Sequence, residues 1–347
     1  MSQPNSTVRL LLLLTLLASC ASNVNGSRGE EDGFSPQWPP APQAARISYL
    51  YSLSTPADAN IGNSFLNRTL RFIKGTEPET LSKPQGIHVD RSGRLYVVDT
   101  QQKRIHVFDS RNSVYFWFPE KPSADFEFPV DVTADGAGRV YVSDASTKVF
   151  HVFDRYGREY LEAIGADQLK RPTGLAIRPE SNELLVVDTL ASSLVVFDTR
   201  DFSIKARAGR DGLQSDALHF PTNIALAPDG TVYVTDTLNF RIQSLKSDLV
   251  FDGHFGEAGD GPGFFSRPKG VAVDSDHNIY VVDALFDNVQ IFNKDGDFLM
   301  AFGTSGQAAG EFWLPNDIFI DSNDLIYIAD SYNSRVQVFQ YAGRAIQ

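Results

Sequence analysis

Short apolar runs recur at a nearly constant spacing from residue 84 to the end of the chain. Each unit opens with a proline and an apolar run, as in "PTGLAIR" from Pro172 and "PKGVAVD" from Pro268. A turn rich in Gly, Asn and Asp follows, then a second run that ends in aspartate, a third run, and usually a fourth that ends in glycine. Such runs of Val, Ile, Tyr and Phe between turn residues predict antiparallel strands joined by hairpins. The opening prolines lie 43 to 49 residues apart: Pro84, Pro129, Pro172, Pro221, Pro268 and Pro315.

This repeat predicts the fold class. A unit of four strands cannot bury both faces of its own sheet, so it must stack against its neighbours. Closing the stack into a ring removes the two end faces and the exposed strand edges of a linear array. We therefore expect an all-β chain, a six-bladed β-propeller with four antiparallel strands in each blade.

The sixth unit lacks a fourth strand, because its third run, "RVQVFQY" (Arg335–Tyr341), nearly ends the chain. A strand-like segment, "ISYLYSL" (Ile47–Leu53), lies before the first unit and has no other partner. We expect this N-terminal strand to complete blade six and close the ring. Between it and Pro84, residues 63–73 ("NSFLNRTLRFI") place apolar residues at helical spacing, which predicts a short surface helix.

The N-terminal residues predict that the protein is exported from the cytoplasm. Residues 10–18 are apolar except for Thr15, which is too short for a membrane helix but typical of a secretory signal. The following "LASC" (residues 17–20) resembles a bacterial lipobox, and Cys20 would then be the lipidated first residue. The alternative is an ordinary signal peptide cleaved near Ala21.

The lipobox implies three regions: a lipoprotein signal peptide (1–19), a lipid-anchored cysteine with a flexible tether (20–45) and the propeller (46–347). Proline, Ser, Asn and Gly dominate the middle region, and such a composition cannot form a core. The expected location is the cell envelope of a bacterium, attached to the membrane through the lipid alone. Ala21 and Ser22 after the cysteine favour the outer membrane, facing the periplasm or the cell surface.

The repeat can also be compared with a known family. The pattern Pro-x-Gly-(Val/Ile)-Ala-Val-Asp, then Ile-Tyr-Val-Val-Asp, then Arg-Val-Gln-Val-Phe resembles the NHL repeat over roughly residues 80–341. Two glycine-spaced linkers, at residues 255–268 and 302–315, resemble the family's connections. The resemblance implies a six-bladed propeller. The third unit departs from it at "RPESNELL", and the second carries Asp131 where the repeat prefers glycine.

The net charge of the chain limits the classes of partner that it is expected to bind. The chain has 31 Lys and Arg against 43 Asp and Glu, a net charge of −12. Members of the resembling family that bind RNA use a basic face, so we do not expect nucleic-acid binding here. The expected partner is a protein, a peptide or an envelope glycan, and the propeller is expected to be a monomeric domain. Cys20 is the single cysteine, so the chain can form no internal disulfide.

The aspartates that end the second strands are expected to be structural. A carboxylate at a strand end accepts nearby backbone N–H groups, and a catalytic site seldom needs six copies. Arg104, Arg241 and Arg335 lie five residues after three of them and are candidate ion-pair partners. The six aspartates are Asp99, Asp144, Asp188, Asp236, Asp283 and Asp330.

The third residue of each opening run gives the sharpest candidate site. Read around the ring, these residues alternate: Gly86, Asp131, Gly174, Asn223, Gly270 and Asp317. Because innermost strands converge on the axis, Asp131, Asn223 and Asp317 are expected to direct oxygen atoms toward one channel mouth. Oxygen ligands of this kind suit Ca²⁺ or Mg²⁺. The alternative is that Asp and Asn replace glycine here and bond to backbone.

Histidines do not support a zinc enzyme. Two of them share a third-strand position (His106 and His151), one lies in a turn (His277), and the other three come from different strand types (His88, His219 and His254). Some propellers of the resembling class are lyases that use a metal with histidine ligands. No matching set is present near the axis, so those residues are not carried over and no catalytic residue is assigned.

Two functions remain open. The favoured one is a binding or scaffold module that uses the channel mouth and the loops beside Trp313, with Phe265 and Phe312 expected to cap the core. The alternative is a propeller enzyme of lyase or lactonase type, with a divalent cation held by Asp131, Asn223 and Asp317. No other cofactor is expected.

Overall fold

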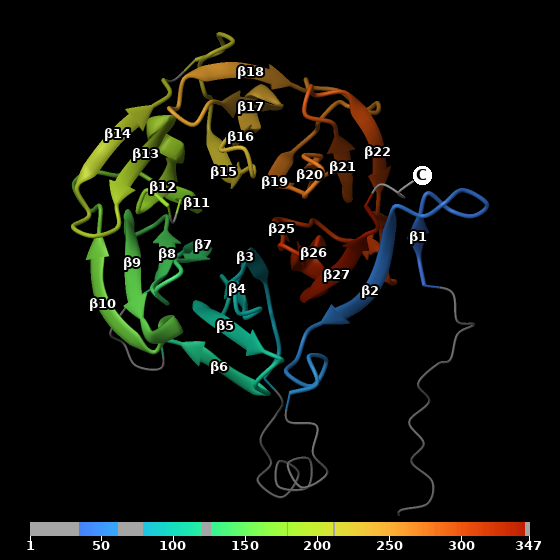
Figure 1. The fold of residues 1–347 in the computed structure, drawn as a ribbon, viewed down its shortest axis with the longest axis horizontal. Coiled ribbons are helices and arrows are strands. Elements are labelled where there is room, and N and C mark those ends of the chain that lie inside the picture. The colour runs from blue at the N-terminus through green and yellow to red at the C-terminus, as the bar shows by residue number, and fades with distance from the viewer. Residues whose placement is uncertain (1–34, 62–78, 120–125, 179, 211, 344–347) are drawn as a thin grey trace, which may run out of the picture. The chain divides into compact units, whose positions relative to one another are not determined.

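The computed structural model describes residues 35–61, 79–119, 126–178, 180–210 and 212–343. The chain divides into two units, Met1–Ser35 and Pro36–Gln347, and the second is described here. It is all-β, a six-bladed propeller in which each blade has four antiparallel strands (Figure 1), so the predicted fold class is confirmed. The predicted signal peptide, Cys20 and the predicted helix over residues 63–73 lie outside the described residues. Within those ranges, no helix is long and apolar enough to span a membrane.

Blades one to three follow the repeat strand by strand. Blade one comprises β3 (Pro84–Val89), β4 (Leu95–Asp99), β5 (Arg104–Asp109) and β6 (Val114–Phe118). Blade two comprises β7 (Pro129–Ala134), β8 (Val140–Asp144), β9 (Val149–Asp154) and β10 (Glu159–Ile164). Blade three comprises β11 (Pro172–Arg178), β12 (Glu183–Asp188), β13 (Ser193–Asp198) and β14 (Ile204–Ala208).

Blades four and five repeat the same order. Blade four comprises β15 (Pro221–Leu226), β16 (Val232–Asp236), β17 (Arg241–Leu245) and β18 (Phe251–Phe255). Blade five comprises β19 (Pro268–Val273), β20 (Ile279–Asp283), β21 (Asn288–Phe292) and β22 (Phe298–Phe302). Short β23 (Thr304–Ser305) and β24 (Glu311–Phe312) pair in the linker that follows. Four 3₁₀ turns complete the described elements: η1 (Arg155–Gly157), η2 (Thr189–Ala191), η3 (Thr237–Asn239) and η4 (Ser331–Asn333).

Blade six contains both ends of the propeller. It comprises β25 (Ile318–Ile320), β26 (Leu325–Asp330), β27 (Arg335–Tyr341) and β2 (Ile47–Leu53). Strand β2 pairs antiparallel with β27 from Ile47 opposite Tyr341 to Leu53 opposite Val336. The predicted ring closure by the N-terminal strand is therefore confirmed, and the two strands lie side by side in Figure 1.

The folded unit begins earlier than residue 46, where the predicted tether ends. β1 (Gln37–Trp38) adds a fifth strand to blade six by pairing with β2. The Trp38 ring packs 5.6 Å from Phe302 and 6.0 Å from Phe339, measured between ring centroids. An aromatic side chain of this size gains enough by burial to order the proline-rich segment around it.

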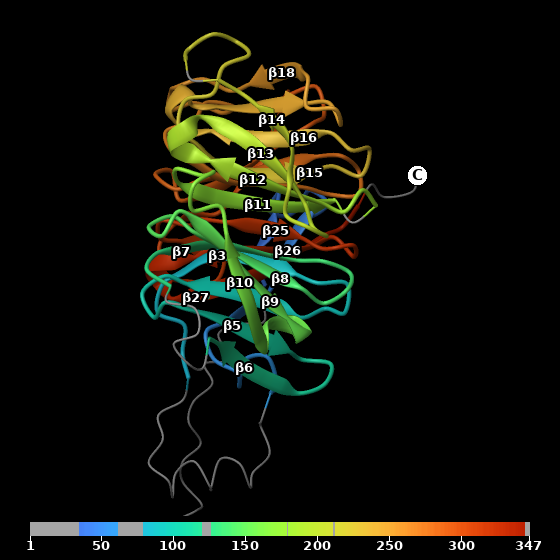
Figure 2. The ribbon, with the colours of Figure 1, turned by 90° about the vertical axis from the view of Figure 1, so that its left-hand side faces the viewer.

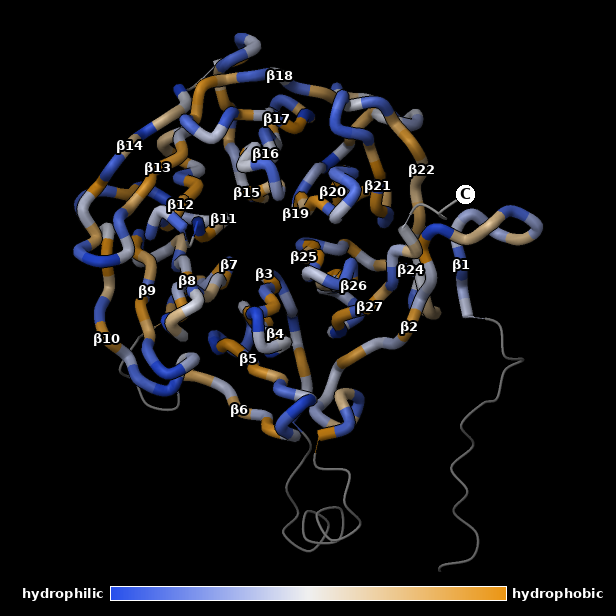
Figure 3. Tube along the Cα trace, in the orientation of Figure 1, coloured by the Kyte–Doolittle hydropathy of each residue, from blue (hydrophilic) through white to orange (hydrophobic). Residues whose placement is uncertain are grey.

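The hydrophobic core is divided into six clusters, each between two neighbouring blades. In the cluster between blades two and three, for example, the ring centroids of Phe150 (β9) and Phe197 (β13) lie 5.1 Å apart. Each sheet is thus buried on both faces, and apolar stretches recur in every blade while the connecting turns are polar (Figure 3). The innermost strands follow one another around the axis in chain order, from β3 to β25 (Figure 1, Figure 2).

Candidate functional site: the mouth of the central channel

The polar third residues of blades two, four and six, here called the axial ring (Asp131, Asn223 and Asp317), lie at the centre of the propeller. The side-chain amide of Asn223 donates to Asp317 Oδ1 at 2.9 Å. Asp131 Oδ1 accepts the backbone N–H of Val132 at 2.8 Å. Each ring residue also accepts the N–H of the fourth residue of the next blade: Asp131 Oδ2 from Leu175 (2.8 Å), Asp317 Oδ2 from Ile87 (2.8 Å) and Asn223 Oδ1 from Val271 (3.5 Å).

An irregularity in the innermost strands makes this arrangement possible. In β11 the pairing with β12 shifts register between Pro172 and Leu175, and the equivalent shift occurs in β3, β15 and β19. A register shift takes residues out of the ladder and leaves their N–H groups without a partner on the adjacent strand. Pairing resumes with Leu175 opposite Val186, and because β11 is an edge strand of its sheet, the N–H of Leu175 can bond to Asp131 of the neighbouring blade.

The glycines of the odd blades have a steric cause. A Cβ atom at Gly174 would lie 2.8 Å from the Cα of Asn223, and one at Gly270 would lie 2.7 Å from the Cα of Asp317. A Cβ at Gly86 would lie 2.6 Å from the carbonyl oxygen of Val130. Backbone atoms cannot move aside as a side-chain end can. Glycine and polar residues therefore alternate because neighbouring backbones meet too closely at the axis for a side chain on both.

Gly174→Ala is expected to lower the free energy of unfolding by about 1–3 kcal/mol, because the new methyl group overpacks the axis. The measurement is a urea unfolding curve at equilibrium. Gly136→Ala is the matched control, since its Cβ would lie 3.7 Å from the nearest atom, Nη1 of Arg91. Equal stability of the two variants would show that the axis has room to spare.

Burial raises the pKa of both ring carboxyls. The pKa of Asp317 rises to about 6 by burial, although hydrogen bonds from Ile87 and Asn223 oppose the change. The pKa of Asp131 is raised well above its ordinary value by burial first and by the charge of Asp317 second. Burial and the closeness of the two carboxyls thus disfavour the state in which both are charged.

The oxygen atoms of the axial ring, in their present hydrogen-bonded arrangement, are poorly suited to bind a cation. Both carboxylates already use each of their oxygens to accept N–H or amide groups, and Asn223 turns its NH₂ toward Asp317. A Ca²⁺ or Mg²⁺ ion needs ionised oxygen ligands, so it would have to displace these donors. Across the described ranges, no group of three or more His, Cys, Asp or Glu residues is arranged to hold a metal ion. The predicted metal site stays a prediction.

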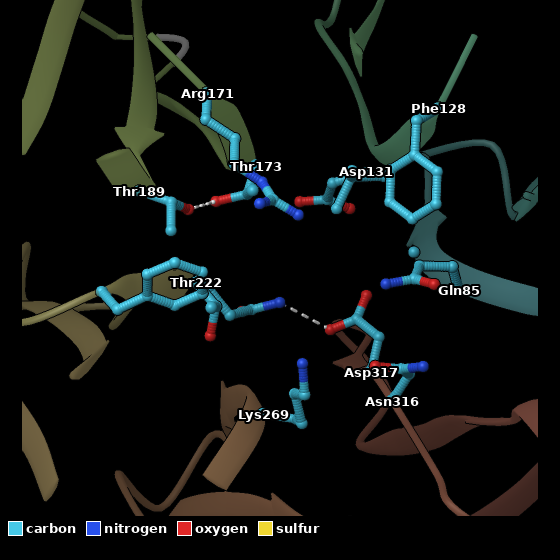
Figure 4. Close-up of a pocket in the computed structure, with 14 residues that line it drawn as sticks. Gln85, Phe128, Asp131, Arg171, Thr173, Thr189, Thr222, Lys269, Asn316 and Asp317 are labelled. Atoms are coloured by element: carbon cyan, nitrogen blue, oxygen red, sulfur yellow. Dashed lines mark hydrogen bonds between the residues drawn. The ribbon is translucent and has the colours of Figure 1, made fainter. Parts of the chain in front are cut away.

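The axial ring separates two cavities along the channel. The first, here called the polar mouth, has a volume of about 100 Å³ and lies where the innermost strands begin. The second lies beyond the ring, has a volume of about 240 Å³, and is lined mainly by aliphatic residues of the innermost strands. All three ring residues line both cavities. The polar mouth adds Gln85, Phe128, Arg171, Thr173, Thr189, Phe220, Thr222, Lys269 and Asn316 (Figure 4).

The polar mouth holds two cations without counter-ions. Neither Arg171 nor Lys269 forms an ion pair with an Asp or Glu of the described part of the chain, although most other arginines there do. Burial, and then the positive charges of Arg267 and Arg171, lower the pKa of Lys269 to about 8. The Arg171 guanidinium lies 5.7 Å from the ring centroid of Phe220. The mouth therefore brings two mutually repelling cations together beside the two buried carboxyls of the axial ring, and neither cation forms an ion pair with those carboxyls.

The residue before each opening proline explains part of this charge, and our sequence analysis missed it. The sequence shows it as an alternation of basic and apolar residues before the opening prolines, which follows the alternation of glycine and polar residues in the third position. Basic residues precede the odd blades, where the third residue is glycine, and apolar residues precede the even ones. The series is Lys83, Phe128, Arg171, Phe220, Arg267 and Leu314.

The strand-end aspartates are structural, as predicted. All six are fully buried, and each accepts a backbone N–H from the segment that leads into its own blade. In blade three, for example, Asp188 Oδ2 accepts the N–H of Lys170 at 2.9 Å. These carboxylates therefore fix the linkers that form the rim of the mouth.

Two of the three predicted arginine partners are confirmed. Arg241 Nε donates to Asp236 at 2.8 Å, and Arg335 Nε donates to Asp330 at 2.7 Å. The prediction for Arg104 is wrong, because its guanidinium pairs with Glu79 at 3.3 Å, in the segment that leads into blade one.

The three candidate aromatics divide as expected. Phe265 and Phe312 are fully buried, whereas Trp313 is 45% exposed. The Trp313 ring lies 5.8 Å from that of Tyr332, between centroids, and the Lys83 ammonium lies 4.9 Å from the Tyr332 centroid. Trp313 thus belongs to the face around the polar mouth but does not line the mouth itself.

Comparisons with known proteins agree on the fold. A family model described as a 6-bladed beta-propeller (DUF5128) matches residues 272–346, which lie in the last two blades. No curated protein sequence matches the chain. The resemblance to the NHL repeat itself stays a prediction.

Solved structures share the architecture at low sequence identity. A protein of unknown function from Bacteroides thetaiotaomicron is 16% identical with a TM-score of 0.61, over 75% of this chain and 70% of that one. An auxiliary nutrient binding protein from the same organism is 14% identical with a TM-score of 0.59 (76% and 70%). Virginiamycin B lyase from Staphylococcus aureus is 13% identical with a TM-score of 0.55 (76% and 86%). The likeness to binding proteins and enzymes alike extends to the six-bladed propeller fold and no further.

Proposed function

We propose that this chain is a lipid-anchored, extracytoplasmic propeller that binds a partner at the polar mouth of its channel. The partner is a protein, a peptide or an envelope polysaccharide. The observation that carries this proposal is the pair of cations, Arg171 and Lys269, that meet at the mouth without counter-ions. A partly buried positive charge without a partner costs stability, so its retention favours a ligand that supplies the missing anion.

The small volume of the polar mouth favours contact with part of a larger partner over enclosure of a whole substrate. Pockets for small molecules have volumes of roughly 300–1,000 Å³. The polar mouth, at about 100 Å³, has room for about three water molecules or one charged group. A group that projects from a larger partner fits such a cavity.

The proposed anchor is supported by the sequence around Cys20. An apolar run ends in "LASC", and proline-rich sequence follows before the propeller. A mass spectrum of the mature protein is expected to show a lipid-modified N-terminal Cys20. An unmodified Cys20, or a mature start beyond it, would overturn the anchor and leave the binding role to be judged by its own test.

The binding role is tested by photo-crosslinking in the native envelope. A photoreactive residue at Leu238 or Leu285, exposed on loops beside the mouth, is expected to give a covalent adduct. Leu161 and Leu299 are the matched controls, since they are similarly exposed but lie on the outermost strands β10 and β22. Adducts of equal yield from the mouth and the outer strands, or none from the mouth, would contradict the proposal.

The enzyme alternative has one observation in its favour, the buried carboxyl pair with raised pKa values, Asp131 and Asp317. Elemental analysis of the purified protein tests it. One equivalent of Ca²⁺ or Mg²⁺ that is lost in Asp131→Asn would support the metal enzyme. Metal-free protein that still gives mouth-specific adducts would support the binding role.

A further inference from the structure

Large apolar side chains surround the polar mouth at equivalent positions. The second residue after the strand-end aspartate is apolar or aromatic in four consecutive blades, and each is 47–55% exposed. Trp313 and Phe128, also exposed, lie on the linkers of the same face. These exposed side chains recur from blade to blade around one face, and we call them the apolar rim: Phe128, Leu190, Leu238, Leu285, Trp313 and Tyr332. Large apolar side chains exposed at equivalent positions in neighbouring blades favour contact with the apolar side chains of a partner.

A groove extends the mouth outward over blades two and three. A cavity of about 370 Å³ shares Phe128 and Arg171 with the polar mouth and is lined further by Leu190 of the rim. Besides Arg171, its charged residues are two lysines, Lys148 and Lys170, and one glutamate, Glu127. Apolar contact and positive charge therefore run together from the channel axis to the edge of this face.

We propose that this face binds an extended protein segment in which acidic side chains alternate with apolar ones. The inference rests on the proposed function and specifies its partner. One carboxylate of the segment enters the polar mouth between Arg171 and Lys269, where its charge relieves their repulsion. Further carboxylates meet Lys148 and Lys170 in the groove, while apolar side chains pack on Leu190, Leu238 and Leu285.

The rim decides between a peptide and an acidic polysaccharide. An acidic glycan would satisfy the cations, but it would leave the leucines of blades three to five largely uncovered. Aliphatic side chains from a protein bury that surface, at roughly 25 cal/mol for each Å² removed from water. Protein interfaces combine apolar contact with charge complementarity, and a glycan would supply only the charge, which favours the peptide.

Peptide selection tests the inference. Random peptides displayed on phage are selected on the full chain, purified in detergent, and are counter-selected on Arg171→Gln/Lys269→Gln. Peptides that survive are expected to be enriched in Asp or Glu flanked by apolar residues. Their affinity, measured by fluorescence anisotropy, is expected to fall at least about tenfold in the double variant, because the peptide carboxylate loses its charged hydrogen bonds to both side chains.

Matched variants test whether affinity depends on these particular residues or on any surface cation or apolar side chain. Arg158→Gln/Lys294→Gln removes two cations that lie outside the mouth and its groove and is expected to leave affinity unchanged. Leu238→Ser/Leu285→Ser is expected to weaken binding several-fold, and Leu299→Ser to have no effect. Thermal unfolding of every variant confirms that each is folded.

Three results would overturn the inference. They are selected peptides without acidic enrichment, equal binding to the double variant, or polygalacturonate that binds at the mouth more tightly than any peptide. If mouth-specific crosslinks persist in the envelope in these cases, the proposed binding role stands and the peptide chemistry alone is wrong. If the crosslinks are absent as well, both fail.

Discussion

Asp236→Ala is expected to lower the free energy of unfolding by about 3–5 kcal/mol, the usual cost of leaving a buried charge without its partner. Asp236 is fully buried and accepts hydrogen bonds from Arg241 Nε at 2.8 Å and from the side chain of Asn239 at 2.7 Å. It also accepts the backbone N–H of His219. Removing it leaves the guanidinium of Arg241, itself buried, without its only carboxylate among the described residues. Chemical denaturation at equilibrium measures the effect.

A double variant identifies the cause. In Asp236→Ala/Arg241→Leu both charges are gone, so the penalty for the uncompensated guanidinium disappears and part of the stability is expected to return. The remaining loss reflects the linker N–H that the carboxylate no longer accepts. A double variant that is less stable than Asp236→Ala would show that the ion pair is not the source of the effect.

Removal of the ring-closing strand is expected to abolish cooperative folding. Ile47 and Leu53 of β2 are buried in two different core clusters, one shared by blades five and six and the other by blades six and one. Without β2, the whole length of β27 also becomes an unpaired edge, which promotes aggregation. A chain that starts at residue 54 is therefore expected to be insoluble or to unfold without a clear transition.

The control for that truncation starts at residue 35. It keeps β1 and β2 and every described strand of the propeller, so its melting temperature is expected to equal that of the full chain. Circular dichroism against temperature gives the comparison. Equal melting curves for starts at residues 35 and 54 would contradict ring closure by β2.

The sequence predicted what depends on local pattern. Strand order, the closing role of Ile47–Leu53 and the structural role of the strand-end aspartates all follow from apolar period, turn residues and position in the repeat. The alternation at Asp131, Asn223 and Asp317 was visible too. Its cause was not, because it depends on how closely the backbones of neighbouring blades meet at Gly174 and Gly270.

The remaining features required spatial information. That Arg171 and Lys269 lack counter-ions is a property of distances between blades, which neither the net charge of −12 nor the basic residues before the odd-blade prolines could reveal. The Arg104 pairing failed because Glu79, outside the repeat, lies nearer than Asp99 to the guanidinium. Trp38 lies in proline-rich sequence typical of a tether, yet its ring packs against those of Phe302 and Phe339.

The most direct test of the binding mouth is the titration of Lys269 with and without a ligand. Lysines labelled by reductive ¹³C-methylation report their pKa values by NMR, and Lys269→Arg assigns the signal. In the free protein the pKa is expected at about 8, because the mouth is buried and other cations face it. When an acidic peptide from the selection saturates the protein, the carboxylate should raise that pKa toward the ordinary lysine range. A pKa that stays near 8 in the complex, or that is already ordinary in the free protein, would contradict a cationic binding mouth.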